Sequence, residues 1–368
     1  MSKLFSPLKL GPLTLSNRII VAPMCQYSAD EGRATDWHAM HLGNMAISGA
    51  GLLILEATAV EARGRSTAYD LGLWNDDTQQ ALATVLASVR KYSTMPIGIQ
   101  LNHAGRKASS KRQWEGGGAI APDAPTGWQT VSASSVSFHE GDPLPKPADR
   151  DDISDIVKAF GDAARRADKL GLDVIEIHAA HGYLLHQFLS PLSNQRTDEY
   201  GGTLENRMRL VLQVFDAVRE AFPKSKPVGV RISATDWVDG GWNLEQSLVL
   251  AEALDDRGCS FIHVSTAGLS PLQKIPVGPS YQVTFADAIK KMVKMPVIAV
   301  GLITQPEQAE SIIVEEKADA VALARAMLYD PRWPWHAAAK LGAKITPPPQ
   351  YLRSEPHEAR GLFKTADA

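Results

Sequence analysis

The sequence predicts an α/β fold in which eight parallel strands close into a barrel surrounded by helices, the (β/α)8 or TIM barrel. Eight short apolar runs recur along the 368 residues. Most of them lack polar alternation, as expected of parallel strands that are buried on both faces. Amphipathic stretches of helical period separate the runs. A single barrel domain over residues 1–368 therefore accounts for the chain.

The predicted strands are rich in Val, Ile, Leu and Ala. They are Arg18–Pro23, Leu52–Val60, Pro96–Leu101, Val174–His178, Val228–Ser233, Phe261–Thr266, Pro296–Gly301 and Ala320–Arg325. Helices are predicted between them at Asp76–Lys91, Asp151–Leu170, Leu204–Phe222, Leu244–Arg257 and Gln305–Glu316. A doubly wound open sheet is the alternative, but the Gly-rich dinucleotide fingerprint expected after its first strand is absent.

Three segments depart from a plain barrel. Leu8–Leu15 predicts a small hairpin under the barrel. Asn102–Arg150, rich in Gly, Pro, Ser and Trp, predicts a long irregular loop, and such loops at a catalytic face are usually functional. Residues 342–368 predict an extended tail, because Pro347–Pro349 disfavours a helix there.

Composition narrows the function class. A formal net charge of −3, with scattered Lys and Arg, gives no reason to expect nucleic acid or an anionic membrane as partner. The only two cysteines, Cys25 and Cys259, cannot hold an iron–sulfur cluster and suggest no disulfide framework. The first residues lack the apolar core of a signal peptide, and no apolar run reaches membrane-spanning length. A cytoplasmic enzyme is therefore expected.

Candidate chemistry gathers where the predicted strands end, which is the catalytic face of such barrels. The fourth strand runs into His178, followed by His181 and Tyr183. Two imidazoles and a phenol this close together can hydrogen-bond to an oxygen atom of a ligand and supply a proton to a neighbouring atom. A structural histidine pair, or half of a metal site, is the alternative interpretation of these residues.

A second group of residues predicts a phosphate site. Gly301 ends the seventh strand, and Ala324 and Arg325 end the eighth. Barrels commonly hold a phosphate at this place through backbone N–H groups.

Four motifs in order resemble the old yellow enzyme family of flavin-dependent ene-reductases, in its thermophilic-like bacterial branch. They are Pro23–Tyr27, Gln100–Lys107, His178–Tyr183 and Leu189–Gly202, and the resemblance runs from Asn17 to Arg353. Members of the family often have Gly where this chain has Ala324, a change that leaves the backbone N–H in place.

The resemblance implies FMN across the barrel mouth and NADPH or NADH as reductant. The implied cofactor-binding residues are Ala22, Pro23, Met24, Cys25, Ala57, Gln100, Arg231, Gly301, Ala324 and Arg325. Gln100 would bind the pyrimidine edge of the flavin, and Arg231 would place a positive charge beside it. Cys25 would tune the flavin potential, or else fill space as a small buried side chain.

The resemblance also implies the reaction. His178 and His181 would bind the carbonyl oxygen of an α,β-unsaturated substrate, and Tyr183 would give the proton to its α carbon. Tyr27 would close over the substrate, while Lys107 is either a ligand-side cation or a plain loop charge. Activated alkenes are the expected substrates, with nitro compounds as a further class.

The tail carries the last implied residue, since Arg353 matches an arginine that reaches into the neighbouring subunit's site. A homodimer or a dimer of dimers is the expected assembly.

Three rival functions share parts of this pattern. A 2,4-dienoyl-CoA reductase needs a Cys-ligated cluster and a second nucleotide domain, which two cysteines and 368 residues exclude. A metal-dependent barrel lyase or hydrolase needs carboxylates at other strand ends, where Glu56 is the only obvious candidate. A non-catalytic flavin-binding protein would not require the His, His and Tyr set.

Overall fold

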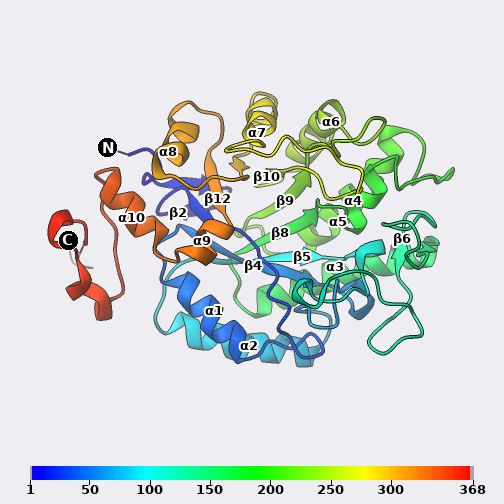
Figure 1. Ribbon diagram of the computed structural model, residues 1–368, viewed down its shortest axis with the longest axis horizontal. Coiled ribbons are helices and arrows are strands. Elements are labelled where there is room, and N and C mark those ends of the chain that lie inside the picture. Colours follow the sequence, from blue (N-terminus) through cyan, green and yellow to red (C-terminus); the bar gives the residue numbers. More distant parts are fainter. Residues whose placement is uncertain (1, 365–368) are drawn as a thin grey trace.

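The computed structural model describes residues 2–364 and shows a closed barrel of eight parallel strands, confirming the predicted fold. Around the barrel the strands follow one another in the order β10, β11, β12, β3, β4, β5, β8 and β9. Their bounds are β3 Ile19–Val21, β4 Leu52–Ala59, β5 Ile97–Asn102, β8 Val174–Ala179, β9 Val228–Ser233, β10 Ile262–Ser265, β11 Val297–Ala299 and β12 Ala320–Leu323. All eight predicted strands are present, several of them two or three residues shorter (Figure 1).

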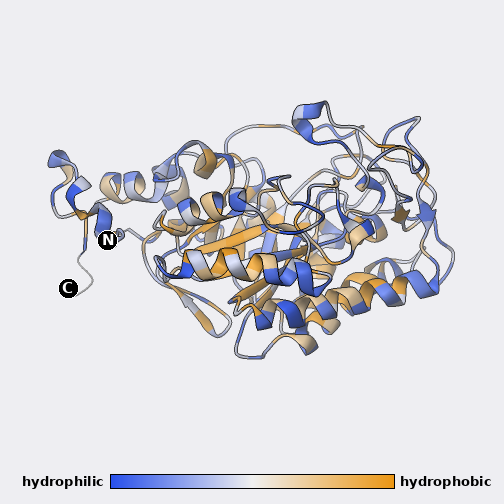
Figure 2. Ribbon diagram, turned by 90° about the horizontal axis from the view of Figure 1, so that it is seen from below, coloured by the Kyte–Doolittle hydropathy of each residue, from blue (hydrophilic) through white to orange (hydrophobic). Residues whose placement is uncertain are grey.

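Ten α-helices are found in the described part of the chain. They are α1 Asp36–Ala46, α2 Asp76–Arg90, α3 Arg150–Lys169, α4 Leu184–Leu189, α5 Leu204–Ala221, α6 Leu244–Asp255, α7 Val283–Lys290, α8 Pro306–Val314, α9 Arg325–Tyr329 and α10 Trp333–Lys340. The five predicted helices are confirmed to within three residues at each end. The helix α3 begins after Asp149, whose carboxylate accepts the Asp152 amide proton as an N-cap. Figure 2 shows mostly apolar strands inside and outer helices in which apolar and polar residues alternate, as in amphipathic helices.

The hairpin β1 Leu8–Leu10 and β2 Leu13–Leu15 closes the lower end of the barrel, as predicted. Leu8, Leu10 and Leu15 are buried in one cluster with residues that begin the strands, such as Val174 and Ala320. The opposite end, where the strands terminate, is left for the long loops.

The loop between β5 and α3 is long and mostly irregular, also as predicted. It contains the 3₁₀ turns η2 Gly105–Lys107 and η3 Gln113–Glu115 and a two-residue parallel pair, β6 Val131–Ser132 with β7 Lys146–Pro147. A further 3₁₀ turn, η1 Ala62–Gly64, follows β4.

The prediction that the tail is extended after its prolines was wrong for Gln350–Arg353. The 3₁₀ helix η4 spans Pro349–Ser354, and η5 spans His357–Ala359. A proline is tolerated in the first turn of a helix, because its φ angle fits and its missing N–H has no partner to lose. Only the prolines that precede this turn keep the extended geometry, with Pro348 at φ −60° and ψ 147°.

The described part of the tail packs on α10. Trp335 of α10 lies in a small cluster with Ile345 and Leu362, and its ring centroid is 6.2 Å from that of Tyr351. Figure 1 shows this segment projecting from one side of the barrel. Arg353 is exposed on it.

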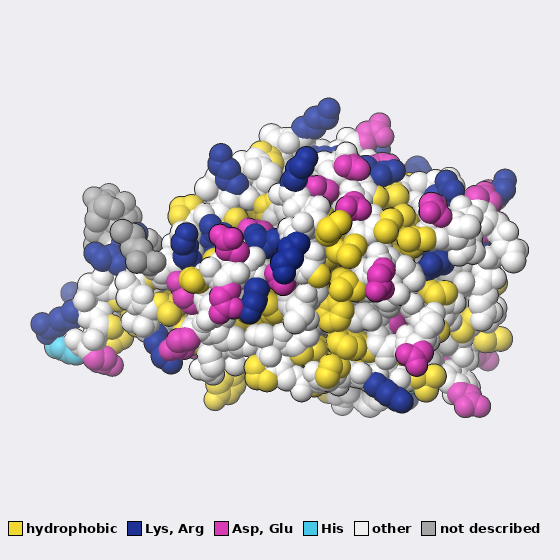
Figure 3. Space-filling view, turned by 90° about the horizontal axis from the view of Figure 1, so that it is seen from above, with side chains coloured by type: hydrophobic (Ala, Val, Ile, Leu, Met, Phe, Trp, Pro, Cys, Tyr) yellow, Lys and Arg dark blue, Asp and Glu magenta, His cyan; other side chains and the backbone are white. Residues whose placement is uncertain are grey.

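None of the helices in residues 2–364 has the length and apolar character to cross a membrane. On the face over α6, α7 and α8, apolar side chains form a band, and cationic and anionic side chains are mixed on both sides of it (Figure 3). This face therefore carries no single-sign charge patch of the kind that nucleic acid requires.

Candidate active site

The carboxyl end of β8 brings three of the predicted catalytic residues together. His178 Nε2 lies 3.3 Å from His181 Nδ1, and the two ring planes are 87° apart. The Tyr183 ring centroid is 4.9 Å from that of His178. The predicted His, His and Tyr cluster is thus a single compact group.

Hydrogen bonds on the far side of each imidazole favour neutral rings with defined tautomers. His178 Nδ1 accepts the amide proton of Ala180 at 3.2 Å, so the ring proton lies on Nε2. His181 Nε2 lies 2.8 Å from Ser265 Oγ. If the serine hydroxyl donates this bond, the His181 proton lies on Nδ1. Two N–H groups then face one point, and a shared oxygen acceptor satisfies both.

Burial keeps these imidazoles uncharged. It lowers the pKa of both His178 and His181 well below the ordinary value, and the nearby Arg231 guanidinium adds to the effect. Burial also raises the pKa of the Tyr183 phenol. The three groups are therefore a pair of neutral donors beside a protonated phenol.

The turn after β8 adopts a strained conformation. His181 has a φ of 56°, which non-glycine residues rarely adopt. At Gly182, with φ 72°, an added Cβ would lie 2.1 Å from the carbonyl oxygen of Gly268. Glycine is therefore required at this position.

Four contacts hold that turn in place. The His181 amide donates to Ser233 Oγ at 2.9 Å, and its carbonyl accepts from Lys107 Nζ at 2.9 Å. The Gly182 amide donates to His186 Nδ1 at 2.9 Å, and its carbonyl accepts from Gln187 Nε2 at 2.7 Å. His186 in turn is paired through Nε2 with a buried carboxylate at 2.9 Å. Together these contacts hold His181 in its strained backbone conformation.

The sequence left the role of Lys107 open. Its ammonium group lies against the turn after β8. Besides the His181 carbonyl it contacts that of Gly268 at 3.1 Å, and Nζ is 5.2 Å from the Tyr183 ring centroid. Burial lowers its pKa to about 8, helped by the neighbouring Arg106 guanidinium. The interpretation as a plain loop charge is therefore wrong.

The segment Pro23–Tyr27 forms a second wall. Tyr27 has a φ of 49°, and its ring lies 5.8 Å from Trp114 of the long loop. The Gln26 amide donates to Glu56 Oε2 at 2.8 Å, so the carboxylate that a metal site would have needed binds backbone instead. Burial raises the pKa of the Cys25 thiol well above its ordinary value, so Cys25 is a neutral S–H group.

Two predicted cofactor residues point into the barrel from β5 and β9. Gln100 Nε2 donates to Glu176 Oε1 at 2.7 Å, which leaves the amide oxygen of Gln100 on the other side. Arg231 is buried, and its Nε has no hydrogen-bond partner among the described residues. Such an orphaned cationic donor indicates an acceptor that binds here.

A cavity of about 180 Å³ lies at the ends of β9 to β12. It brings together four residues predicted for the cofactor: Arg231, Gly301, Ala324 and Arg325. Gly301 has φ 123°, and an added Cβ would lie 2.6 Å from Gln282 Nε2. Backbone amides and two guanidinium groups around one cavity suit an anion.

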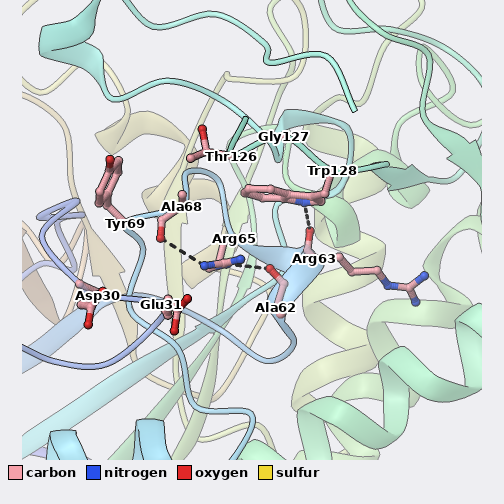
Figure 4. A pocket seen from close by; sticks show the side chains of 11 residues that line it. Asp30, Glu31, Ala62, Arg63, Arg65, Ala68, Tyr69, Thr126, Gly127 and Trp128 are labelled. Carbon is pink, nitrogen blue, oxygen red and sulfur yellow. Dashed lines mark hydrogen bonds between the residues drawn. The ribbon is translucent and has the colours of Figure 1, made fainter. Parts of the chain in front are cut away.

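A second cavity, of about 540 Å³, lies between η1 and the long loop (Figure 4). Its central side chain is Arg65, stacked between Trp74 and Trp128 at 5.4 and 5.1 Å. Arg63 joins it on the lining, with Asp30 and Glu31 as carboxylates of opposite charge. None of the predicted site residues lines this cavity.

The remaining predicted residues have separate positions. Ala22 and Ala57 are buried at the ends of β3 and β4, while Pro23 and Met24 are partly buried beside them. Arg353 lies in η4 of the tail and is exposed.

Sequence reasoning missed several contributors. Ser233, Ser265 and Gln187 support the turn or the imidazoles, and Glu176 and His263 lie inside the barrel. Of these residues, only Glu176 and His263 could have been singled out from the sequence, because a titratable side chain within an apolar, buried strand is costly unless it has a partner or a role.

In residues 2–364 no three His, Cys, Asp or Glu side chains are grouped so that they could hold a metal ion. The alternative of a metal-dependent lyase or hydrolase therefore has no ligand set in this part of the chain.

Comparison with known proteins adds to this geometry. Residues 3–343 match the model of the NADH:flavin oxidoreductase / NADH oxidase family. An NADPH dehydrogenase of Geobacillus thermodenitrificans is 44% identical over 352 residues, which are 95% of this chain and 98% of that protein. One of Listeria innocua is 44% identical over 356 residues, 96% of this chain and 99% of that protein. A solved structure of morphinone reductase in complex with tetrahydroNAD matches with a TM-score of 0.76 and 29% identity, over 95% of this chain and 94% of that one.

Proposed function

Because this chain belongs to the NADH:flavin oxidoreductase / NADH oxidase family, we propose that it reduces activated alkenes at the mouth of the barrel. It is an NAD(P)H-dependent flavin oxidoreductase of the old yellow enzyme family, with FMN as its cofactor. The proposal adds the substrate class, α,β-unsaturated carbonyl compounds with nitro compounds beside them, and the roles of the residues. FMN, when bound, would supply the hydride chemistry, with NAD(P)H as the source of the hydride and the β carbon of the alkene as its acceptor.

The residues at the strand ends fit FMN. Arg325 and the backbone amides near Gly301 and Ala324 would hold the phosphate at the smaller cavity. The amide oxygen of Gln100 would accept from the imide N–H of the ring, and the orphaned Nε of Arg231 would donate to its pyrimidine edge. Ala22, Pro23, Met24, Cys25 and Ala57 would back the ring.

The imidazole pair binds the substrate oxygen. With the His181 proton on Nδ1, the N–H groups of His178 and His181 lie side by side, their nitrogens 3.3 Å apart, and together hold one carbonyl oxygen and stabilise the negative charge that develops on it. Neutral imidazoles do this without transferring a proton to the oxygen. Tyr27 closes the site from the opposite wall.

Tyr183 is the proton donor to the α carbon. Its phenol stands next to His178 and stays protonated across the working pH range. It is therefore an acid and not a base at the start of the step. These roles require the two imidazoles and the phenol together, and that compact group is the observation that carries the proposal.

A spectroscopic cycle tests the proposal. The purified protein should be yellow, lose its absorbance on anaerobic addition of NADPH, and regain it on addition of 2-cyclohexenone. A protein that is bleached by NADPH but never recoloured by any enone would instead be a flavin-binding protein without this activity.

We also propose that the working unit is at least a homodimer, with Arg353 of one subunit entering the site of the other. The tail is held on α10 by Trp335, so it projects in a defined direction, and Arg353 is exposed on it. A guanidinium arriving there would add positive potential where enolate charge develops. A cytoplasmic location, consistent with the two free thiols of Cys25 and Cys259, stays a prediction.

A further inference from the structure

A buried carboxylate lies inside the barrel and has no part in the proposed reaction. Glu176 of β8 is fully buried, and it hydrogen-bonds to Gln100 Nε2 on one neighbouring strand at 2.7 Å. Its other oxygen lies 2.8 Å from Nδ1 of His263 on β10. A buried carboxylate is costly unless it is paired, so a role that needs it is expected.

The charge state of this group is defined by its neighbours. Burial alone would raise the pKa of Glu176, but His263 and Arg231 outweigh burial and the pKa is lowered. Burial lowers the pKa of His263, with a further contribution from Arg231. Glu176 is therefore an anion, and the Nδ1–H group of His263 donates a hydrogen bond to it.

An anionic Glu176 decides which way the Gln100 amide points. A carboxylate only accepts hydrogen bonds, so the NH₂ group of Gln100 must face it. The oxygen of Gln100 then faces away from Glu176 and can accept from an N–H group of a ligand. The reversed amide would place two acceptors against each other.

The same anion offsets the positive charge of Arg231. The two groups lie on the neighbouring strands β8 and β9, where Arg231 pairs in register with His178, two residues after Glu176. Burial lowers the pKa of the Arg231 guanidinium, and the nearby Glu176 carboxylate acts against that lowering. Arg231 lines the smaller cavity and has an unpartnered Nε among the described residues. A ring bound there is therefore exposed to the combined electrostatic potential of Arg231 and Glu176, and not to that of Arg231 alone.

We propose that Glu176 is a positioning residue that orients Gln100 and sets the flavin reduction potential by offsetting Arg231. The proposal rests on the placement of FMN given above, but not on the substrate class. Without Glu176, the uncompensated cation would stabilise reduced flavin, which carries more negative charge. Glu176 thus holds the potential lower than Arg231 alone would make it.

The test is the two-electron potential of bound FMN in Glu176→Gln, measured by dye equilibration without any enone. At a fixed solution potential, the ratio of reduced to oxidised flavin should rise roughly tenfold, which is about 30 mV for a two-electron couple. FMN should also dissociate faster. The substituted side chain can present its own NH₂ group to Gln100, so the Gln100 amide is no longer held with its oxygen towards the flavin. A potential equal to that of the wild type, or a lower one, would overturn the proposal.

A matched control removes one negative charge from the residue just before the same strand. Asp173 immediately precedes β8, where it accepts the Ile97 amide proton at 2.9 Å at the lower end of the barrel. Asp173→Asn should leave the ratio of reduced to oxidised flavin within about twofold of the wild-type ratio, since the Asp173 charge is partly exposed and screened by solvent. An equal shift in both variants would mean that the effect is a general loss of charge or packing, which would also overturn the proposal.

A second variant covers the case in which Glu176→Gln does not retain FMN. Glu176→Asp keeps the charge but shortens the side chain, so FMN should bind more weakly with a potential close to the wild-type value. A tenfold rise in the ratio for Glu176→Asp would contradict a role through charge. If the reduction potentials of the variants change as expected but enones are still not reduced, the proposed substrate class is wrong and the role of Glu176 is supported.

Discussion

At the scale of single residues, the environment of each titratable group fixes its protonation state. His178 and His181 are held neutral by burial, and Tyr183 is held protonated by the same cause. This division predicts distinct effects for the three side chains.

Tyr183→Phe should separate the two halves of the catalytic cycle. The proton is needed only when the alkene is reduced, so recolouring by enone should slow by about 10² or more, the usual size of general-acid catalysis. Bleaching by NADPH should stay within about twofold of the wild-type rate. Stopped-flow absorbance gives both rates, and equal slowing of the two steps would remove Tyr183 from the role of proton donor.

His178→Ala should weaken the binding of simple phenols as well as turnover of enones. A phenolate oxygen would occupy the place beside His178 Nε2 and His181 Nδ1 that is proposed for the enone oxygen. Loss of one donor to a buried partner costs roughly 1–3 kcal/mol. Phenol titration followed by the change in flavin absorbance measures this cost, and unchanged affinity would exclude His178 from the oxygen site.

The same two histidines predict how stability depends on pH. Their pKa values in the folded protein are lower than the unfolded value of about 6.5. Below that pH the unfolded chain binds protons that the folded protein does not, so stability falls as the pH falls. Urea denaturation between pH 7 and 5 should show this loss, with a shallower slope in His181→Asn. Equal slopes would mean that the buried imidazoles do not titrate in this way.

At the scale of elements, the turn after β8 leaves no room for a side chain at Gly182. Gly182→Ala forces a Cβ to 2.1 Å from the Gly268 carbonyl oxygen at a φ of 72°. The free energy of unfolding should fall by about 1–3 kcal/mol or more, with phenol binding lost as well. The matched control is Gly202→Ala, where φ is 77° but no atom lies within 4 Å of the added Cβ. If both variants lose the same stability, the close approach to Gly268 is unimportant.

The elements also show what the sequence could and could not predict. Buried parallel strands give continuous apolar runs, so all eight strands could be located. The turn residues His181 and Gly182 could be identified by motif, but not their supports. Ser233 and Ser265 reach them from β9 and β10, and such contacts between distant segments leave no periodic signal. Pro349 misled the tail prediction, because proline stops an existing helix but can begin a new one.

At the scale of the whole molecule, the tail should link two barrels. Truncation after Pro349 removes Arg353 and should raise the Michaelis constant for the enone while FMN stays bound. Mixing this truncated chain with a Tyr183→Phe chain should restore some activity, since heterodimers would contain one site with neither defect. Activity that never exceeds the average of the two parents would show that the tail does not cross between subunits.

In the proposed reaction, the barrel mouth adds a hydride to one carbon of an activated alkene and a proton to the other. The most direct test is to reduce 2-cyclohexenone with unlabelled NADPH in D₂O and to locate deuterium in the saturated ketone by NMR, after correction for exchange next to the carbonyl. We expect deuterium at the α carbon, delivered through Tyr183, and none at the β carbon. Deuterium at the β carbon, or no saturated ketone at all, would contradict it.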